Sequence, residues 1–274
     1  MLEGWQIAAL VVSGLVGGLL GGFLGIGGTI VFMPLLKLTC DANPATRIDA
    51  HTAIAVTLVL NVCVGAAATL GHVRAGRVMG SIVRILVPAS VVASLAGVGV
   101  GNLFAGDAQV WLWRLFGMTM LYVAAFNGYR LVRPLSAVDA APGDFAGPPP
   151  PLYKVGAVGL AAGFAAGLLG IGGGAVAVPA QQMLLRMRLR AAIANSSVTV
   201  IFSCLVAAVL KHLSLGWHGV DPVRPWVLVV LMAPMGVCGA LLGSHLVHRV
   251  PRLWVRLVFI AFLLWTAWEM LRAA

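Results

Sequence analysis

Eight long apolar runs divide the sequence, and they constrain the fold more than any other feature. The runs lie at about residues 6–38, 50–71, 81–104, 109–131, 155–185, 191–213, 225–247 and 253–271. A helix needs about 20 apolar residues to cross the hydrocarbon core of a bilayer, and each run meets that length. Only 9% of the 274 residues are charged, whereas soluble domains carry roughly a quarter. The runs therefore predict an all-α polytopic membrane protein.

Two of the runs are broken by glycine. Residues 21–34 read GGFLGIGGTIVFMP and residues 167–179 read GLLGIGGGAVAVP, with glycines and a proline in matching places. Helix interiors tolerate proline and glycine least of all residues. Broken backbone at membrane depth is tolerated only where it is buried in protein or lines a wet cavity. The two stretches therefore predict a break in each run, beside a cavity near the middle of the membrane.

The two halves of the sequence also resemble each other outside these stretches. DAHTAIAVT at 49–57 corresponds to AAIANSSVT at 191–199, and GVGVG at 97–101 corresponds to GALLG at 239–243. An internal repeat in a helical membrane chain is typical of transporters. The expected organisation is an N-terminal repeat at 1–133, a Pro-rich linker at 134–153 and a C-terminal repeat at 154–274.

The basic residues distinguish two topologies. If all eight runs cross the membrane, the 18 Lys and Arg residues split 9 to 9 between the two sides. If the two broken runs are re-entrant hairpins, the split is 12 to 6, which agrees with the positive-inside rule. That topology places the linker in the cytoplasm and both termini outside.

Each half then consists of one glycine-broken re-entrant hairpin and three transmembrane helices. Three crossings are an odd number, so the halves are two inverted repeats, an architecture used for alternating access around a midplane site. The first broken run has about 33 residues, which would measure about 50 Å as one helix. We expect it to divide into two arms of about 16 residues.

Glycines and polar residues near the breaks are the candidate ligands. A broken helix exposes free N–H groups and its positive dipole end, which attract anions, and hydroxyl and amide groups can donate hydrogen bonds to a small oxyanion. The predicted substrate-binding residues are Gly25, Gly27, Gly28, Thr29, His51, Thr52, Gly170, Gly172, Gly173, Gly174, Asn195, Ser196 and Ser197. The alternative is structural, because glycines allow close helix packing and polar side chains join neighbouring helices. His51 is also the candidate proton carrier, because histidine titrates near neutral pH.

Motifs of other functional classes are missing. The sequence has no GxSxG, HExxH or P-loop, and its net charge of +10 is scattered among short loops rather than gathered in a patch. Its four cysteines have no CxxC or metal-ligand spacing. We therefore expect no enzyme activity, no catalytic residue, no metal, no cofactor and no nucleic-acid partner. The expected partners are a small anionic substrate and the lipid bilayer, and a homodimer is allowed.

The glycine blocks and the segments after them resemble a known family. GGFLGIGGTIVFMPLL with AHTAIAVT, and AGLLGIGGGAVAVPAQQML with ANSSVTVIF, resemble the two halves of the TauE/SafE sulfite exporter family over nearly the whole chain. The sequence departs from the family at Thr29, where the second half has Gly174, and at the HT of His51 and Thr52, where a glycine-Thr-Ser type sequence is usual.

The resemblance implies a secondary transporter that exports small sulfur-containing or organic anions, such as sulfite, sulfoacetate or sulfonates. It also implies a bacterial inner (plasma) membrane, so the termini that are expected outside would be periplasmic. The alternatives are an anion channel or uniporter, a permease for small carboxylates, and a membrane scaffold or enzyme without transport activity.

Overall fold

The computed structural model describes residues 2–24, 28–74, 76–132, 145, 148–246 and 252–272, and within them the chain is nearly all helical. The predicted all-α fold class is therefore confirmed. The α-helices are α1 (Gly4–Leu24), α2 (Thr29–Asp41), α3 (Ala50–Arg74), α4 (Gly80–Asn102), α5 (Val110–Val132), α7 (Leu152–Leu169), α8 (Gly174–Leu184), α9 (Leu189–Ser214), α10 (Val223–Leu246) and α11 (Arg252–Arg272). The short 3₁₀ helices are η1 (Pro44–Thr46), η2 (Gly106–Gln109) and η3 (Leu215–His218).

Six of the described helices are long and apolar enough to cross a membrane: α1, α3, α4, α7, α9 and α10. Two predicted site residues, Gly25 and Gly27, lie outside the described residues, and so does most of the predicted linker at 134–153. The described part of that linker ends at Pro151, because α7 begins at Leu152, two residues earlier than expected.

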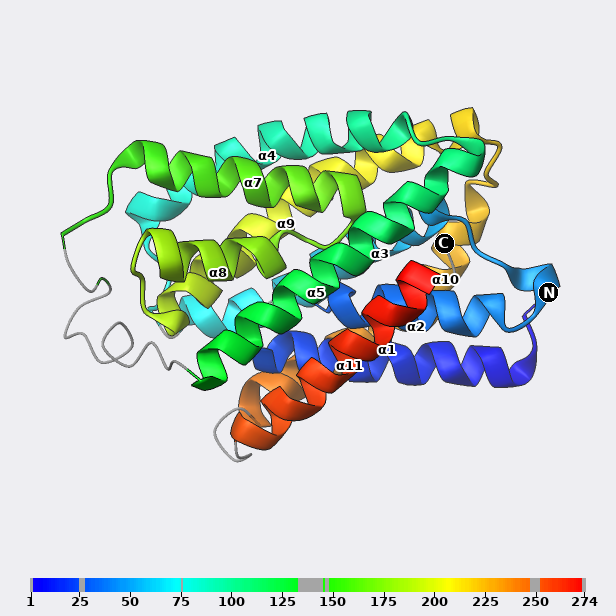
Figure 1. The fold of residues 1–274 in the computed structure, drawn as a ribbon, viewed down its shortest axis with the longest axis horizontal. Helices are drawn as coiled ribbons and strands as arrows, with labels where there is room; N and C mark the ends of the chain where they lie inside the picture. The colour runs from blue at the N-terminus through cyan, green and yellow to red at the C-terminus, as the bar shows by residue number, and fades with distance from the viewer. Residues whose placement is uncertain are drawn as a thin grey trace.

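Each glycine-broken run folds into a pair of antiparallel helices. α1 runs away from the end of the molecule that holds the N-terminus, and α2 returns to that end (Figure 1). Gln6, near the start of α1, donates from Nε2 to the carbonyl oxygen of Thr39, near the end of α2, at 3.0 Å. α7 and α8 form the corresponding pair and extend into the molecule from the opposite end (Figure 1).

The two arms of each pair are unequal, which corrects the expectation of two arms of about 16 residues. α1 has 21 residues and α2 has 13, whereas α7 has 18 and α8 has 11. In the first run, for which two arms of about 16 residues were expected, the reason is that the glycines lie toward its far end. A Cβ on Gly28 would lie 2.9 Å from the carbonyl oxygen of Gly17, so α2 starts about 20 Å along α1. The second arm of each pair therefore begins inside the molecule.

Glycines hold the first arm of each pair against a helix of the other half. On α1, a Cβ added to Gly14, Gly18 or Gly22 would overlap a backbone carbonyl of α10. The counterparts on α7, which meet the backbone of α4, are Gly159, Gly163 and Gly167. Small residues at this spacing let helix backbones approach closely, and van der Waals packing then drives their association in a membrane.

The helix contacts of one half recur in the other half. α1 packs along α10 as α7 packs along α4, and α3 contacts α10 as α9 contacts α4. α3 also packs against α9, and α5 packs against α11. If each helix is replaced by its counterpart in the other half, the same set of contacts results. α3 and α9 therefore lie where elements of both halves meet.

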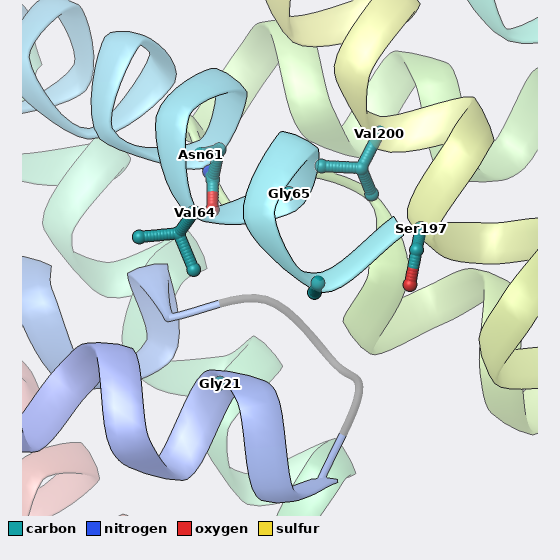
Figure 2. Close-up of a pocket in the computed structure, with 7 residues that line it drawn as sticks. Gly21, Asn61, Val64, Gly65, Ser197 and Val200 are labelled. Atoms are coloured by element: carbon teal, nitrogen blue, oxygen red, sulfur yellow. The ribbon is translucent and has the colours of Figure 1, made fainter. Parts of the chain in front are cut away.

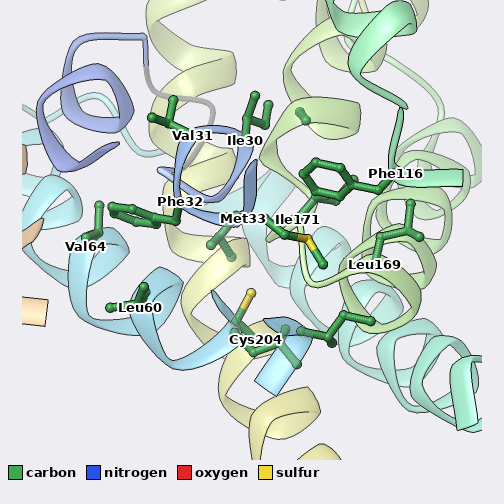
Figure 3. Packing of buried hydrophobic residues seen from close by; sticks show 14 of the residues in the cluster. Ile30, Val31, Phe32, Met33, Leu60, Val64, Phe116, Leu169, Ile171 and Cys204 are labelled. Carbon is green, nitrogen blue, oxygen red and sulfur yellow. The ribbon is translucent and has the colours of Figure 1, made fainter. Parts of the chain in front are cut away.

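A buried apolar cluster fixes the two breaks against these central helices (Figure 3). Phe32 of α2 lies beside Val64 of α3, whereas Ile171, between α7 and α8, lies beside Met33 of α2 and Phe116 of α5. All five side chains are at most 2% exposed. The cluster therefore positions the start of α2 and the segment between α7 and α8 against α3.

Three basic residues that the charge count treats as loop residues are buried instead. Lys37 and Arg130 are each 8% exposed, and Lys211 is 1% exposed. Without them, the 12 to 6 split becomes 11 to 4. The excess of basic residues on one side is retained.

Candidate substrate site

The break between α7 and α8 depends on glycine geometry. Gly170, Gly172 and Gly173 have φ angles of +68°, +73° and +70°, in the left-handed region that disfavours residues with a Cβ. A Cβ on Gly172 would lie 2.8 Å from Nδ2 of Asn61, and one on Gly170 would lie 2.7 Å from Oγ1 of Thr57. Asn61 donates from Nδ2 to the carbonyl oxygen of Gly170 at 3.1 Å. The break therefore lies directly against the middle of α3.

The short helices α2 and α8 both begin inside the molecule. The first helical N–H donors are Val31 in α2 and Val176 in α8. The two N–H groups that precede each of these donors have no partner within the helix. Free N–H groups and the positive dipole end favour anions at a helix start. The two helix starts therefore provide hydrogen-bond donors for an anion in the interior.

Buried polar atoms without a hydrogen-bond partner occur on the helices around the breaks. Among the described residues these are Oγ1 of Thr29, Oδ1 of Asn61, Oε1 of Gln181, both side-chain amide atoms of Gln182, and Nδ2 of Asn195. Leaving a polar atom unpaired in the interior costs about 1–3 kcal/mol. Such atoms mark the places where water or a polar ligand can bind.

A small pocket lies between α1, α3 and α9 (Figure 2). Its lining residues are Gly21, Asn61, Val64, Gly65, Ala68, Ser197 and Val200. Asn61 and Ser197 provide its polar side chains. The volume is about 20 Å³, enough for a single water molecule. Binding of a larger anion at this place requires the helices around the pocket to move apart.

Asn61 connects predicted site residues from different elements. It contacts Gly170 and Gly172 in the break, and it shares the pocket with Ser197 of α9. Asn61 is absent from the residues predicted as ligands. The sequence could have indicated Asn61, because it is an amide side chain inside an apolar run, and polar groups within a membrane segment often have a function.

The other predicted residues of α9 bind neighbouring helices at the end of the molecule opposite the N-terminus. Asn195 accepts through Oδ1 from the backbone N–H of Met79 at 2.9 Å, just before α4. The hydroxyl of Ser196 accepts from Nε2 of Gln181 on α8 at 2.7 Å. These two side chains therefore link α9 to α4 and to α8.

His51 and Thr52 lie apart from the breaks. They are in the first turn of α3, and His51 precedes Asn61 by about ten residues, or about 15 Å along the helix. Thr52 donates to the carboxylate of Asp49. Nδ1 of His51 lies 2.6 Å from Nζ of Lys211. Ser197 and the glycines of the second break thus both lie near Asn61, whereas His51 and Thr52 lie at one end of the molecule.

Short helices that start inside a bundle of membrane-length helices, next to free donors, are typical of secondary transporters. Comparison with known families gives the same class. The family model described as "Sulfite exporter TauE/SafE" matches residues 10–270. The chain therefore belongs to the TauE/SafE sulfite exporter family, which confirms the resemblance read from the glycine blocks.

Relatives of the chain carry the names of membrane transporters. It is 27% identical over 246 residues to "Probable membrane transporter protein YunE" of Bacillus subtilis, and the match covers 86% of each chain. It is 29% identical over 223 residues to "Probable membrane transporter protein MamO" of Magnetospirillum gryphiswaldense, a match that covers 72% of this chain and 35% of MamO. The chain thus spans about a third of MamO. No solved structure matches the chain. Family and relatives identify a multi-pass membrane transporter, not an enzyme.

Proposed function

We propose that this protein exports small sulfur-containing or organic anions, such as sulfite, sulfoacetate or sulfonates, across the bacterial inner membrane. One observation carries the proposal: α2 and α8, one from each half, both begin in the interior, where the first two N–H groups of each helix have no partner within the helix. The hydroxyls of Thr29 and Ser197 and the amide of Asn61 lie on the helices around these starts. Neutral donors suit a transported oxyanion, because they bind it without the strong hold of a fixed charge.

We propose further that the site is exposed to each side in turn. In this proposal the two antiparallel helix pairs are re-entrant hairpins and the halves are inverted repeats, with both termini outside. The opposite directions of the two pairs, the reciprocal helix contacts and the excess of basic residues on one side support this arrangement. Alternating access then opens one half against the other around the central helices α3 and α9.

Export is the direction that the membrane potential favours. A negative cell interior drives an anion outward by about 2.3 kcal/mol per charge per 100 mV. Export therefore needs no coupling ion, whereas uptake of the same anion requires one.

Counterflow in proteoliposomes tests the proposed function. We expect vesicles loaded with unlabelled sulfoacetate to take up labelled sulfoacetate, because a carrier exchanges the two, whereas a channel gives no counterflow. Asn61→Leu removes the amide at the second break, and we expect about a tenfold loss of exchange, the effect of one buried hydrogen bond of about 1.4 kcal/mol.

The matched control is Asn127→Leu on α5, because the amide of Asn127 donates to the carbonyl of Val123 within its own helix. We expect this variant to exchange sulfoacetate at the wild-type rate. Absence of saturable flux of sulfite, sulfoacetate and small carboxylates by the wild-type protein would contradict the proposed function.

A further inference from the structure

A buried lysine lies at the end of the molecule where α3 begins and α9 ends. Lys211 of α9 is 1% exposed, and its Nζ lies 2.6 Å from Nδ1 of His51 and 2.6 Å from Oδ1 of Asn102 on α4. Among the described residues, no carboxylate forms an ion pair with Lys211. A buried cation with neutral partners is costly, so its presence indicates a role other than stabilisation.

The hydrogen bond between Nζ of Lys211 and Nδ1 of His51 forms when the pair carries one ionising proton, on either of the two nitrogens. Nε2 of His51 lies 2.9 Å from the carbonyl oxygen of Phe104, which can only accept, so Nε2 carries a hydrogen. Nδ1 of neutral His51 then accepts from the ammonium of Lys211. If the proton moves to His51, the neutral amine accepts instead. Two fully protonated groups cannot keep this contact, because neither has a lone pair for it.

His218 lies next to this pair, on the short helix η3 near the surface. Its ring stacks on that of His51 with centroids 3.7 Å apart, and it lies in η3 beside Trp217, which is 80% exposed. Nε2 of His218 lies 3.4 Å from Oδ1 of Asn102, while Nδ1 has no hydrogen-bond partner among the described residues. Nδ1 is itself buried, so a proton from water reaches it only when η3 moves.

The groups that face the pair come from every element packed around it. Asp49, just before α3, is the acid whose charge acts on Lys211 and on both histidines. α4 contributes the neutral amide of Asn102, and η3 contributes His218. The cluster thus consists of three bases and one carboxylate at a distance from the lysine, so its charge depends on the number of bound protons.

The other half of the sequence lacks this arrangement. LKHLSLG at 210–216 corresponds to LGHVRAG at 70–76, so Gly71 stands at the place of Lys211. In the same way, Ile193 stands at the place of His51. A proton bound by the cluster therefore acts on only one end of the molecule.

We propose that Lys211 and His51 form a proton-binding site that couples anion transport to proton movement. The first proton keeps the pair in contact and ties α9 to α3 and, through Asn102, to α4. A second proton, which enters from water through His218, removes the last lone pair from the contact and separates α3 from α9 at this end. Its release restores the contact. The coupling rests on the transport proposed above, whereas the proton site itself does not.

Nuclear magnetic resonance tests the proton site without any substrate. The full chain, with ¹⁵N-labelled histidines, is titrated in lipid nanodiscs. We expect Lys211→Met to move the midpoints of two of the six histidine titrations by about one pH unit or more, as for strongly interacting groups. Lys154→Met is the matched control, because Lys154 is exposed at the start of α7, and it should leave all midpoints unchanged.

Unchanged histidine midpoints in folded Lys211→Met protein would overturn the proposal. Size-exclusion chromatography and thermal unfolding establish that the variant is folded. If Lys211→Met does not fold, Lys211→Gln takes its place in the same titration. It also removes the positive charge but keeps a polar end, and we expect the same two midpoints to move.

Sulfoacetate flux tests the coupling. In proteoliposomes clamped at zero membrane potential, we expect a pH gradient to drive net sulfoacetate accumulation by the wild-type protein. Lys211→Met should lose this accumulation but keep counterflow at equal pH, because the second proton then has no contact to break. Accumulation that persists in Lys211→Met, or wild-type flux that ignores the gradient, would contradict the coupling. If the wild-type protein moves no sulfoacetate, the proposed function fails, and the titration alone decides the proton site.

Discussion

At the scale of single residues, Gly172 combines a left-handed φ of +73° with close contact to the amide of Asn61. A Cβ at this position is strained by about 1–2 kcal/mol and also pushes Asn61 away from the break. We expect Gly172→Ala to lower sulfoacetate counterflow at least about tenfold and to reduce the thermal unfolding temperature. Both measurements use the same purified protein: unfolding is followed in detergent, and counterflow is followed after reconstitution into liposomes.

The control for this prediction is Gly71→Ala in α3. A Cβ on Gly71 meets no atom within 4 Å, and alanine favours the helix over glycine by about 0.5–1 kcal/mol. This variant should transport normally and unfold at an equal or higher temperature. Equal flux by Gly172→Ala and Gly71→Ala would show that the break tolerates a side chain.

The glycines of the second break could be predicted from the sequence, because a repeated glycine motif is visible without any tertiary contact. Lys211 could not be recognised in the same way. In the sequence it stands a few residues from a loop, where a solvated cation is common, and its burial results from the packing of α3 and α4 against the end of α9. His51 was singled out as a proton carrier, but its partner lies 160 positions away.

At the scale of helices, the contact between α4 and α7 depends on glycines of α7 that pack directly against the backbone of α4. A Cβ on Gly163 would overlap the carbonyl oxygen of Ser90, so a larger residue forces the two helices apart. We expect Gly163→Leu to destabilise the protein by about 1–3 kcal/mol, as overpacking does. Thermal unfolding in detergent measures this loss. Gly156→Leu is the control on the same helix, because a Cβ on Gly156 meets no atom within 4 Å.

The helices themselves follow closely from the apolar runs, because length and hydropathy alone determine which segments can span a bilayer. The unequal arms of the two broken runs were not predicted. Hydropathy is nearly uniform across a broken run, and the break falls where glycines and close contacts with neighbouring helices allow it. For Gly28, that contact is the backbone of α1 at Gly17.

At the scale of the whole molecule, the proposed topology predicts which segments are accessible from each side. In a variant whose four cysteines are replaced, we expect single cysteines at Leu2 and Arg272 to react with a membrane-impermeant maleimide in intact cells. A cysteine at Pro149, in the described part of the linker, should react only after the membrane is permeabilised. Labelling of Leu2 and Pro149 from the same side would refute the proposed orientation.

The reciprocal contacts between the halves have a consequence for the energetics of the transport cycle. If each half adopts the conformation of the other, α1 with α10 and α4 with α7 exchange roles, and the same kinds of contact form in both states. The two end states are then nearly degenerate in free energy, and a small bias sets their populations. That bias must come from residues without an equivalent in the other half. Replacing Gly71 by lysine and Ile193 by histidine would therefore rebalance the two populations rather than destroy either one.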